Sequence, residues 1–125
     1  FPYVAPLQVP HTRAWFAGVA NLRGGLHGVV DLAVFLDLPG RPLSEGQREQ
    51  SHLVALNPAL GLNSALLVDR LAGLRSAAQV VEVAVDNPVR PAFAGACYRD
   101  ADGRVWQEIL LSALAEDALF LGVAA

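Results

Sequence analysis

The sequence contains no lysine, and its positive charge comes from nine arginines that are scattered along the chain. A protein that binds nucleic acid usually presents a basic stripe that neutralises phosphates. No such stripe is present, and the formal net charge is −3. The composition therefore argues against nucleic acid as a partner.

Cysteine and long apolar runs are also scarce. The single cysteine, Cys97, has no partner for an internal disulfide or for a cysteine-based metal site, which is typical of a reducing cytoplasm. No stretch reaches the roughly 18–20 uninterrupted apolar residues that a membrane span needs, and no signal peptide is visible at the start. We expect a cytoplasmic protein that does not insert into the membrane.

Recognisable catalytic patterns are missing as well. His11, His27 and His52 lie far apart without metal-ligand spacing, and we interpret them as surface or interface histidines. No serine has the Gly-x-Ser-x-Gly context of a nucleophile, and Cys97 fits a small buried hydrophobe. The glycines of 24–28 lack the Gly-Lys-Ser/Thr of a phosphate-binding loop. We therefore predict no enzyme activity, no metal and no cofactor.

What the sequence does have is a frequent alternation of turn signals with short apolar or β-branched runs. This pattern is typical of a small barrel or sandwich. We predict strands over Trp15–Leu22, Leu26–Leu32, Ser51–Asn57, Asn63–Val68, Gln79–Val85, Phe93–Tyr98 and Val105–Gln107. The first two form a hairpin that turns at Gly24-Gly25. The fold class is thus mainly β.

Two segments look helical, and a third looks like a surface loop. Asp31–Leu38 predicts a helix of one or two turns that ends before Pro39. Leu110–Leu121 predicts a second helix, with Ser112 as N-cap and Gly122 as C-cap. The polar segment 39–50 is interpreted as a loop that links two halves.

Arg23 is the least ordinary residue, because it follows a strand-like run and precedes two glycines. At a hairpin end it could simply be solvated. Its five donors could instead bind carbonyls or a carboxylate such as that of Asp31. The flanking glycine would let the backbone of a partner come close. Spacing alone leaves these alternatives open.

Several motifs together resemble one known family. The segments Trp15–Gly24, which contains Asn-Leu-Arg-Gly, and Val29–Leu32, which contains Val-Asp-Leu, resemble the signature of CheW-like domains. In the second half, Ala65–Leu71 and Phe93–Tyr98 resemble a strand and the closing hairpin of that family. The ending 114–124 is similar to the PilI-type CheW proteins of twitching motility.

This resemblance implies a fold of two small SH3-like β-barrels with a C-terminal helix. Residues 1–38 would belong to the first barrel, 41–111 to the second, and 112–125 to the helix. Family members begin with two further strands that have no counterpart here, so the first barrel would lack its opening strands. If the chain is a truncation, its open sheet edge favours strand-swapped self-association.

The resemblance also implies a function without catalysis. CheW-like adaptors link the cytoplasmic tip of methyl-accepting chemoreceptors to a CheA-type histidine kinase, at the periphery of membrane receptor arrays. The receptor tip binds in the groove between the barrels, and the kinase binds at barrel ends. Carried over by motif, the receptor- and kinase-binding positions are Gly18, Asn21, Leu22, Arg23, Gly24, Val29, Asp31 and Leu32. The alternative is a CheW-like regulatory domain cut from a larger histidine kinase or hybrid signalling protein.

Overall fold

The computed structural model describes residues 1–41, 43–74, 76–84 and 89–123, with the side chain of Leu119 left out. The chain divides into two compact units, of which the first holds Phe1–Leu71 with the C-terminal residues from Gly122, and the second holds Ala72–Leu121. The sequence placed the division between residues 38 and 41. The pairing of the strands explains why it falls later.

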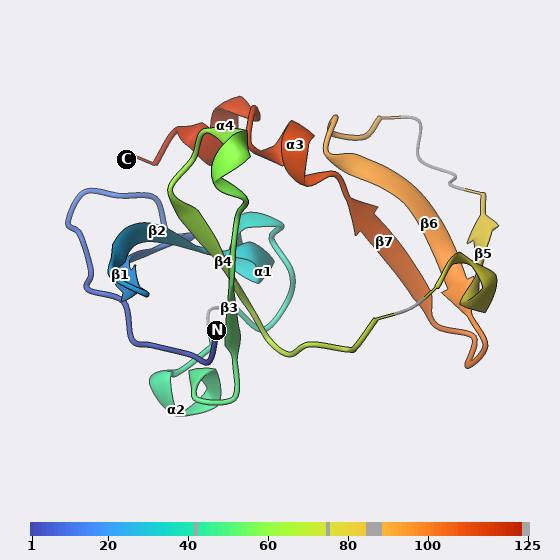
Figure 1. Cartoon of the computed structure of the whole chain (residues 1–125), viewed down its shortest axis with the longest axis horizontal. Coiled ribbons are helices and arrows are strands. Elements are labelled where there is room, and N and C mark those ends of the chain that lie inside the picture. Colours follow the sequence, from blue (N-terminus) through green and yellow to red (C-terminus); the bar gives the residue numbers. More distant parts are fainter. Residues whose placement is uncertain (42, 75, 85–88, 124–125) are drawn as a thin grey trace. The chain divides into compact units, whose positions relative to one another are not determined.

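The first unit is built on a four-stranded sheet with the order β1-β2-β4-β3 (Figure 1). Its strands are β1 (Phe16–Leu22), β2 (Gly25–Asp31), β3 (His52–Ala55) and β4 (Ser64–Val68). β1 and β2 form the predicted hairpin, and β3 pairs antiparallel with β4. β2 and β4 pair in parallel, and this contact joins the two predicted halves into one sheet.

The core of this unit lies on one face of the sheet. Because successive side chains of a strand point to opposite faces, the buried residues alternate along β1, whereas three consecutive residues of β4, Ala65–Leu67, are buried. The cluster contains Ala20, Leu22, Val29, Leu53, Ala65 and Leu67, and Tyr3 and Ala17 pack against it. All four strands therefore contribute to one core, which disfavours a boundary between β2 and β3.

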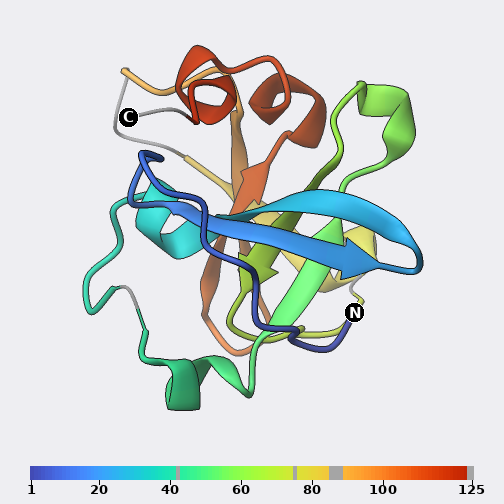
Figure 2. The ribbon, with the colours of Figure 1, turned by 90° about the vertical axis from the view of Figure 1, so that its left-hand side faces the viewer.

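The N-terminal segment joins the two outer strands of the sheet. The N–H of Leu53 in β3 donates to Phe1 O at 2.8 Å, and Leu7 and Val19 in β1 exchange backbone hydrogen bonds of 2.8 and 2.9 Å. The segment runs across the strands from the side of β3 to the side of β1 (Figure 2). It thereby covers both edges of the sheet and completes a small barrel.

Gly18 is the residue that makes this closure sterically feasible. Its φ of +135° is a conformation that residues with a Cβ rarely adopt, and a Cβ here would overlap the carbonyl oxygen of Leu7. The N-terminal segment can therefore hydrogen-bond to β1 only because this position is glycine.

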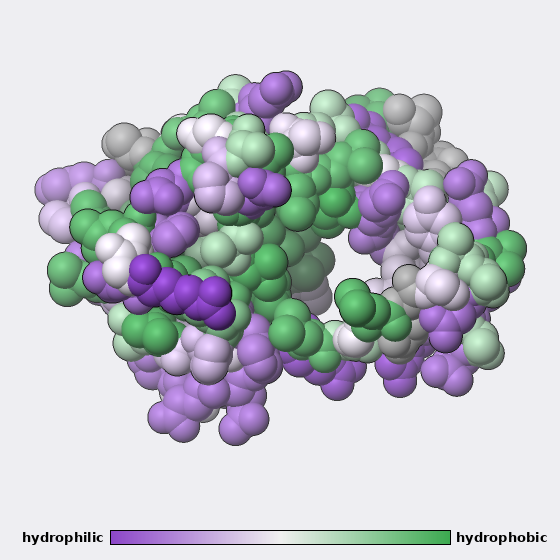
Figure 3. Space-filling view, viewed as in Figure 1, coloured by the Kyte–Doolittle hydropathy of each residue, from purple (hydrophilic) through white to green (hydrophobic). Residues whose placement is uncertain are grey.

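Two short helices connect β2 to β3. Asp31 caps α1 (Leu32–Phe35), its Oδ1 accepting from Val34 N at 3.3 Å, and the helix is shorter than the predicted Asp31–Leu38. Helix α2 (Glu45–Arg48) lies inside the segment predicted as a loop. It begins with a capping box, in which Ser44 and Gln47 exchange hydrogen bonds between side chain and backbone. Hydrophilic residues cover the surface around α2 (Figure 3).

The second unit is a three-stranded antiparallel sheet with the order β5-β6-β7 (Figure 1). The short 3₁₀ helix η2 (Ala77–Gln79) precedes β5 (Val80–Val83), and β6 (Ala94–Asp100) and β7 (Val105–Ile109) form a hairpin. Asp100 Oδ1 closes the predicted Asp-Gly turn by accepting from the backbone N–H of Asp102 and Arg104. Val85, the predicted end of β5, lies outside the described residues.

The predicted C-terminal helix is two separate helices, α3 (Leu111–Leu114) and α4 (Ala118–Leu121). Leu110 occupies the N-cap position of α3 without a side-chain hydrogen bond, so the prediction of Ser112 as N-cap is wrong. Asp117 interrupts the helix, and its Oδ1 accepts from Phe120 N at 3.2 Å. In the described part of the chain, no helix is long and apolar enough to cross a membrane.

Candidate interaction site

The exposed end of the β1–β2 hairpin carries the residue with the most unusual backbone. Leu22 pairs with Gly25 across a two-residue loop, in which Arg23 has a φ of 50° and Gly24 a φ of 83°. Positive φ at both loop positions is typical of a type I′ turn, whose twist matches that of the strands. Glycine adopts this conformation freely, whereas arginine does so at a cost of about 1 kcal/mol.

Two contacts hold Arg23 in this conformation. The Oδ1 atom of Asn21 accepts a hydrogen bond of 2.9 Å from Gly24 N, which fixes the turn. The guanidinium carbon of Arg23 lies 5.0 Å from the centroid of the Phe1 ring, a cation–π geometry. Arg23 itself is exposed. The turn therefore presents a cation at a fixed place on the surface, with its donor groups accessible to a partner.

Asp31 does not take part in this turn, although the sequence made it a candidate partner of Arg23. It lies at the other end of β2, where it is 4% exposed. Its Oδ2 atom accepts a hydrogen bond of 3.2 Å from Arg48 Nη2. Asp31 therefore binds an arginine, but that arginine comes from α2.

Arg48, the partner of Asp31, is a residue of this site that was not predicted from the sequence. Its side chain is 14% exposed, and its second nitrogen lies 3.5 Å from Glu45 Oε1. Glu45 in turn accepts from the hydroxyl of Tyr3 at 3.0 Å. Burial and the nearby Glu45 carboxylate both raise the pKa of the Tyr3 hydroxyl. The Ser-x-x-Gln spacing of the capping box was the signal that could have revealed α2 and hence Arg48.

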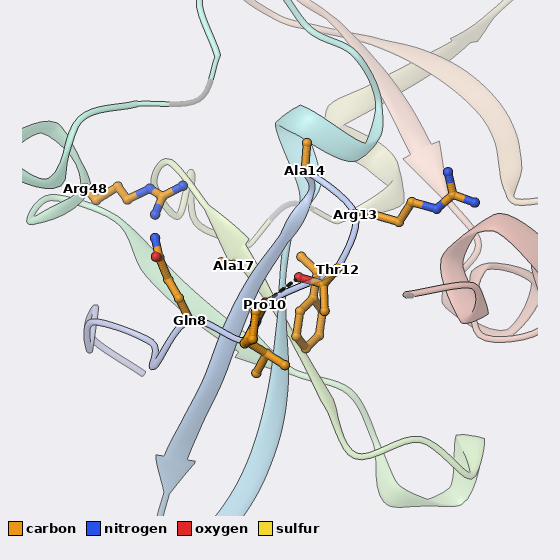
Figure 4. Close-up of a pocket in the computed structure, with 9 residues that line it drawn as sticks. Gln8, Pro10, Thr12, Arg13, Ala14, Ala17 and Arg48 are labelled. Atoms are coloured by element: carbon orange, nitrogen blue, oxygen red, sulfur yellow. Dashed lines mark hydrogen bonds between the residues drawn. The ribbon is translucent and has the colours of Figure 1, made fainter. Parts of the chain in front are cut away.

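A cavity of about 460 Å³ opens beside Arg48 on the first unit (Figure 4). Residues of the segment before β1 and the start of β1 line the rest of it. The side chains of Gln8 and Arg48 point toward one another, whereas that of Arg13 points away (Figure 4). Thr12 Oγ1 donates to Val9 O at 2.9 Å and fixes the loop that forms one wall.

A second arginine joins the loop after α1 to the end of β4. The two terminal nitrogens of Arg41 bind the two carboxylate oxygens of Asp69, one of them at 2.7 Å. These hydrogen bonds hold the pKa of Asp69 below its ordinary value of 3.8. Such a bidentate pair fixes geometry better than a lysine could.

Comparison with known proteins assigns the family. The family model described as CheW-like domain matches residues 1–119, almost the whole chain. The chain belongs to the CheW-like domain family.

A solved structure agrees with this assignment. The CheW-like domain resembles the scaffolding protein CheW from Thermoanaerobacter tengcongensis, with a TM-score of 0.61 and 21% sequence identity. The match covers 85% of this chain and 70% of that one. No sequence among curated proteins matches significantly. The mainly β fold is confirmed. Membership of the family supports a scaffold function in chemotaxis signalling, since CheW family proteins are scaffolds rather than enzymes.

The eight predicted binding positions of the CheW-like domain fall into three places. Asn21, Arg23 and Gly24 form the exposed turn. Leu22 and Val29 are buried in the core cluster, and Gly18 is buried against the N-terminal segment. Asp31 and Leu32 lie at the far end of β2, beside Arg48. The structure therefore brings only the first three together on an accessible surface.

Proposed function

We propose that this CheW-like domain is an adaptor that couples methyl-accepting chemoreceptors to a CheA-type histidine kinase. The exposed Arg23, held in a left-handed conformation on a type I′ turn, is the observation that carries the proposal. Strained backbone persists where the surrounding structure supports it, and it often marks a functional position. Here Asn21 and Phe1 supply that support.

The turn suits recognition of a protein partner. Because hydrogen bonds to charged groups contribute about 1.5–3 kcal/mol each, one fixed guanidinium on a partner carboxylate or carbonyl can dominate a modest interface. Gly24 beside it has open space around its Cα, so a partner backbone can approach closely. We propose that Asn21, Arg23 and Gly24 contact the receptor or the kinase, and that Gly18, Leu22, Val29, Asp31 and Leu32 shape the hairpin behind them.

We assign the domain to the cytoplasmic face of receptor arrays, with twitching motility through type IV pili as its output. The output rests on the PilI-like ending 114–124. Deleting the gene from a bacterium that both twitches and swims should abolish twitching and leave swimming unchanged. Loss of swimming with normal twitching would contradict this assignment.

Reconstitution tests the coupling function itself. Receptor cytoplasmic fragments are tethered to lipid vesicles and mixed with a CheA-type kinase from the same bacterium. We expect the domain to sediment with the vesicles and to bring the kinase with it, raising kinase autophosphorylation. Adding each partner alone separates receptor binding from kinase binding. Failure to bind either partner would refute the proposal.

A further inference from the structure

The open edge of β7 is the feature of the second unit that neither the fold nor the proposed function uses. β7 lies at one margin of the sheet, with β6 between it and β5 (Figure 1). Within the part of the chain that the structure describes, β6 is its one strand partner. An unpaired strand edge is a template for another strand.

The hydrogen-bond pattern shows which backbone groups point away from β6. Asp100 N donates to Arg104 O at 2.9 Å, and Leu110 N donates to Phe93 O at 2.7 Å. Backbone groups in an antiparallel strand alternate in direction, so residues 104, 106, 108 and 110 face β6. The N–H and C=O groups of Val105 and Gln107 therefore face the open side.

We propose that β7 pairs antiparallel with β7 of a second copy, joining two three-stranded sheets across a twofold axis at Trp106. This register sets Val105 opposite Gln107 of the other copy, so their outward backbone groups meet. It also sets Arg104 opposite Glu108 of the other copy, twice over by symmetry. The register thus satisfies hydrogen bonding and charge together.

The side chains favour β7 of a second copy, rather than a peptide of unrelated sequence, as the partner of the open edge. Arg104 and Glu108 are exposed and form no ion pair with another described residue. Opposite charges that face each other across strands are stabilising, whereas like charges are destabilising. Glu108 Oε1 accepts a hydrogen bond of 3.4 Å from Ala96 N on β6, and Arg104 interacts electrostatically with Asp100. Two charges of opposite sign without an ion-pair partner among the described residues, placed symmetrically about Trp106, suit a copy of the same strand.

An apolar cleft on the same sheet contributes to the contact. Trp106 and Tyr98 are cross-strand neighbours, and both line a cavity of about 270 Å³ with Leu74 and Val80. Trp106 is 37% exposed and Leu74 is 99% exposed. In the proposed register the two Trp106 side chains stand opposite one another, so the dimer would cover part of this surface. This pairing adds a strand to an edge and exchanges no segment, unlike strand swapping.

Charge reversal tests the proposal in the full chain. Sedimentation equilibrium should show a dimer whose population rises with protein concentration. R104E and E108R should each weaken dimerisation by about tenfold, because each places like charges opposite at two symmetric positions. The double variant R104E/E108R exchanges the charges and should restore dimerisation. Arg99→Glu, on the opposite face of β6, and Glu82→Arg, on β5, are matched controls that should leave dimerisation unchanged.

Amide hydrogen exchange of the unmodified protein gives a second measurement that needs no variant to fold. The amides of Val105 and Gln107 should become protected as the concentration rises. A protein that stays monomeric at millimolar concentration would overturn the proposal. Three other results would overturn it as well: single charge reversals that leave dimerisation unchanged, a double variant that fails to restore dimerisation, or protection of amides confined to a strand other than β7.

Discussion

Replacing Arg23 by asparagine should separate the function of its side chain from the stability of its turn. Asparagine tolerates a left-handed backbone and is a preferred residue in the first position of a type I′ loop. It removes the guanidinium while keeping the turn. Replacement by alanine also removes the guanidinium, but alanine retains the strain of the φ of 50° found at this position.

The two substitutions differ in their expected effect on the free energy of unfolding. Asparagine relieves backbone strain of about 1 kcal/mol and loses a cation–π contact of about 0.5–1 kcal/mol at an exposed site. These terms nearly cancel, so its Tm should stay within about 4 °C of the unmodified protein. Alanine loses the contact without relieving the strain, and it should be less stable than asparagine by about 1 kcal/mol.

Binding should respond differently from stability. Both variants remove the hydrogen bonds of a charged group, so both should weaken binding to the receptor or kinase by about tenfold to a hundredfold. Thermal unfolding followed by circular dichroism measures the first effect, and vesicle co-sedimentation per folded molecule measures the second. Arg99→Asn, an exposed arginine on β6, is the matched control and should change neither.

Two results would refute this reasoning. If the asparagine variant binds normally, the guanidinium is not the contact, whatever the stability. If asparagine lowers the Tm as much as alanine does, the strain of the left-handed backbone at position 23 does not affect stability. The loss of stability would then come from the missing Arg23 side chain alone.

Three further predictions concern the first unit. Gly18→Ala should destabilise the protein by at least about 2 kcal/mol in urea unfolding, because the new Cβ overlaps the backbone of the N-terminal segment; a change below about 0.5 kcal/mol would contradict this. Asp31→Asn leaves Arg48 buried beside a neutral group and should cost about 2–3 kcal/mol, whereas an unchanged midpoint would show that the pair contributes nothing. The lowered pKa of Asp69 means that its pairing with Arg41 stabilises the fold above the ordinary pKa of 3.8 and that this contribution is lost as the pH falls through the folded value. Arg41→Ala should therefore lower stability at neutral pH and flatten its decline below about pH 4, as measured by urea unfolding at several pH values; an unaltered pH profile would argue against the pair.

Local signals were enough for much of the fold. The glycines after Arg23 predicted the β1–β2 hairpin, because positive φ is needed in a two-residue loop. The Asp-Gly pair predicted the β6–β7 turn in the same way. The predicted turn of the first hairpin at Gly24-Gly25 is wrong by one residue, since the loop is Arg23-Gly24 and Gly25 already pairs with Leu22. The seven predicted strands are present. Their ends differ from the predicted ends by a few residues, and the predicted end of β5 lies outside the described residues. The short helix α2 was missed because four residues give too short a pattern for hydrophobic periodicity.

The candidate site was only partly predictable. The motif of 21–24 placed Asn21, Arg23 and Gly24 together because they are adjacent in sequence. It could not show that Arg23 packs over Phe1 or that Asp31 binds Arg48, since these contacts join residues separated by 22 and 17 positions. Long-range pairs depend on which strands become neighbours.

Short-range backbone preferences and local motifs were therefore enough to predict the strands, the hairpins and the family. The parallel pairing of β2 with β4, the closure of the barrel by the N-terminal segment and the division near residue 71 depend on contacts between distant parts of the chain, and these became known from the folded structure. Backbone N–H and C=O groups are alike in nearly all residues, so they do not specify which strand pairs with which. The choice of partner strand follows instead from how the whole core is buried.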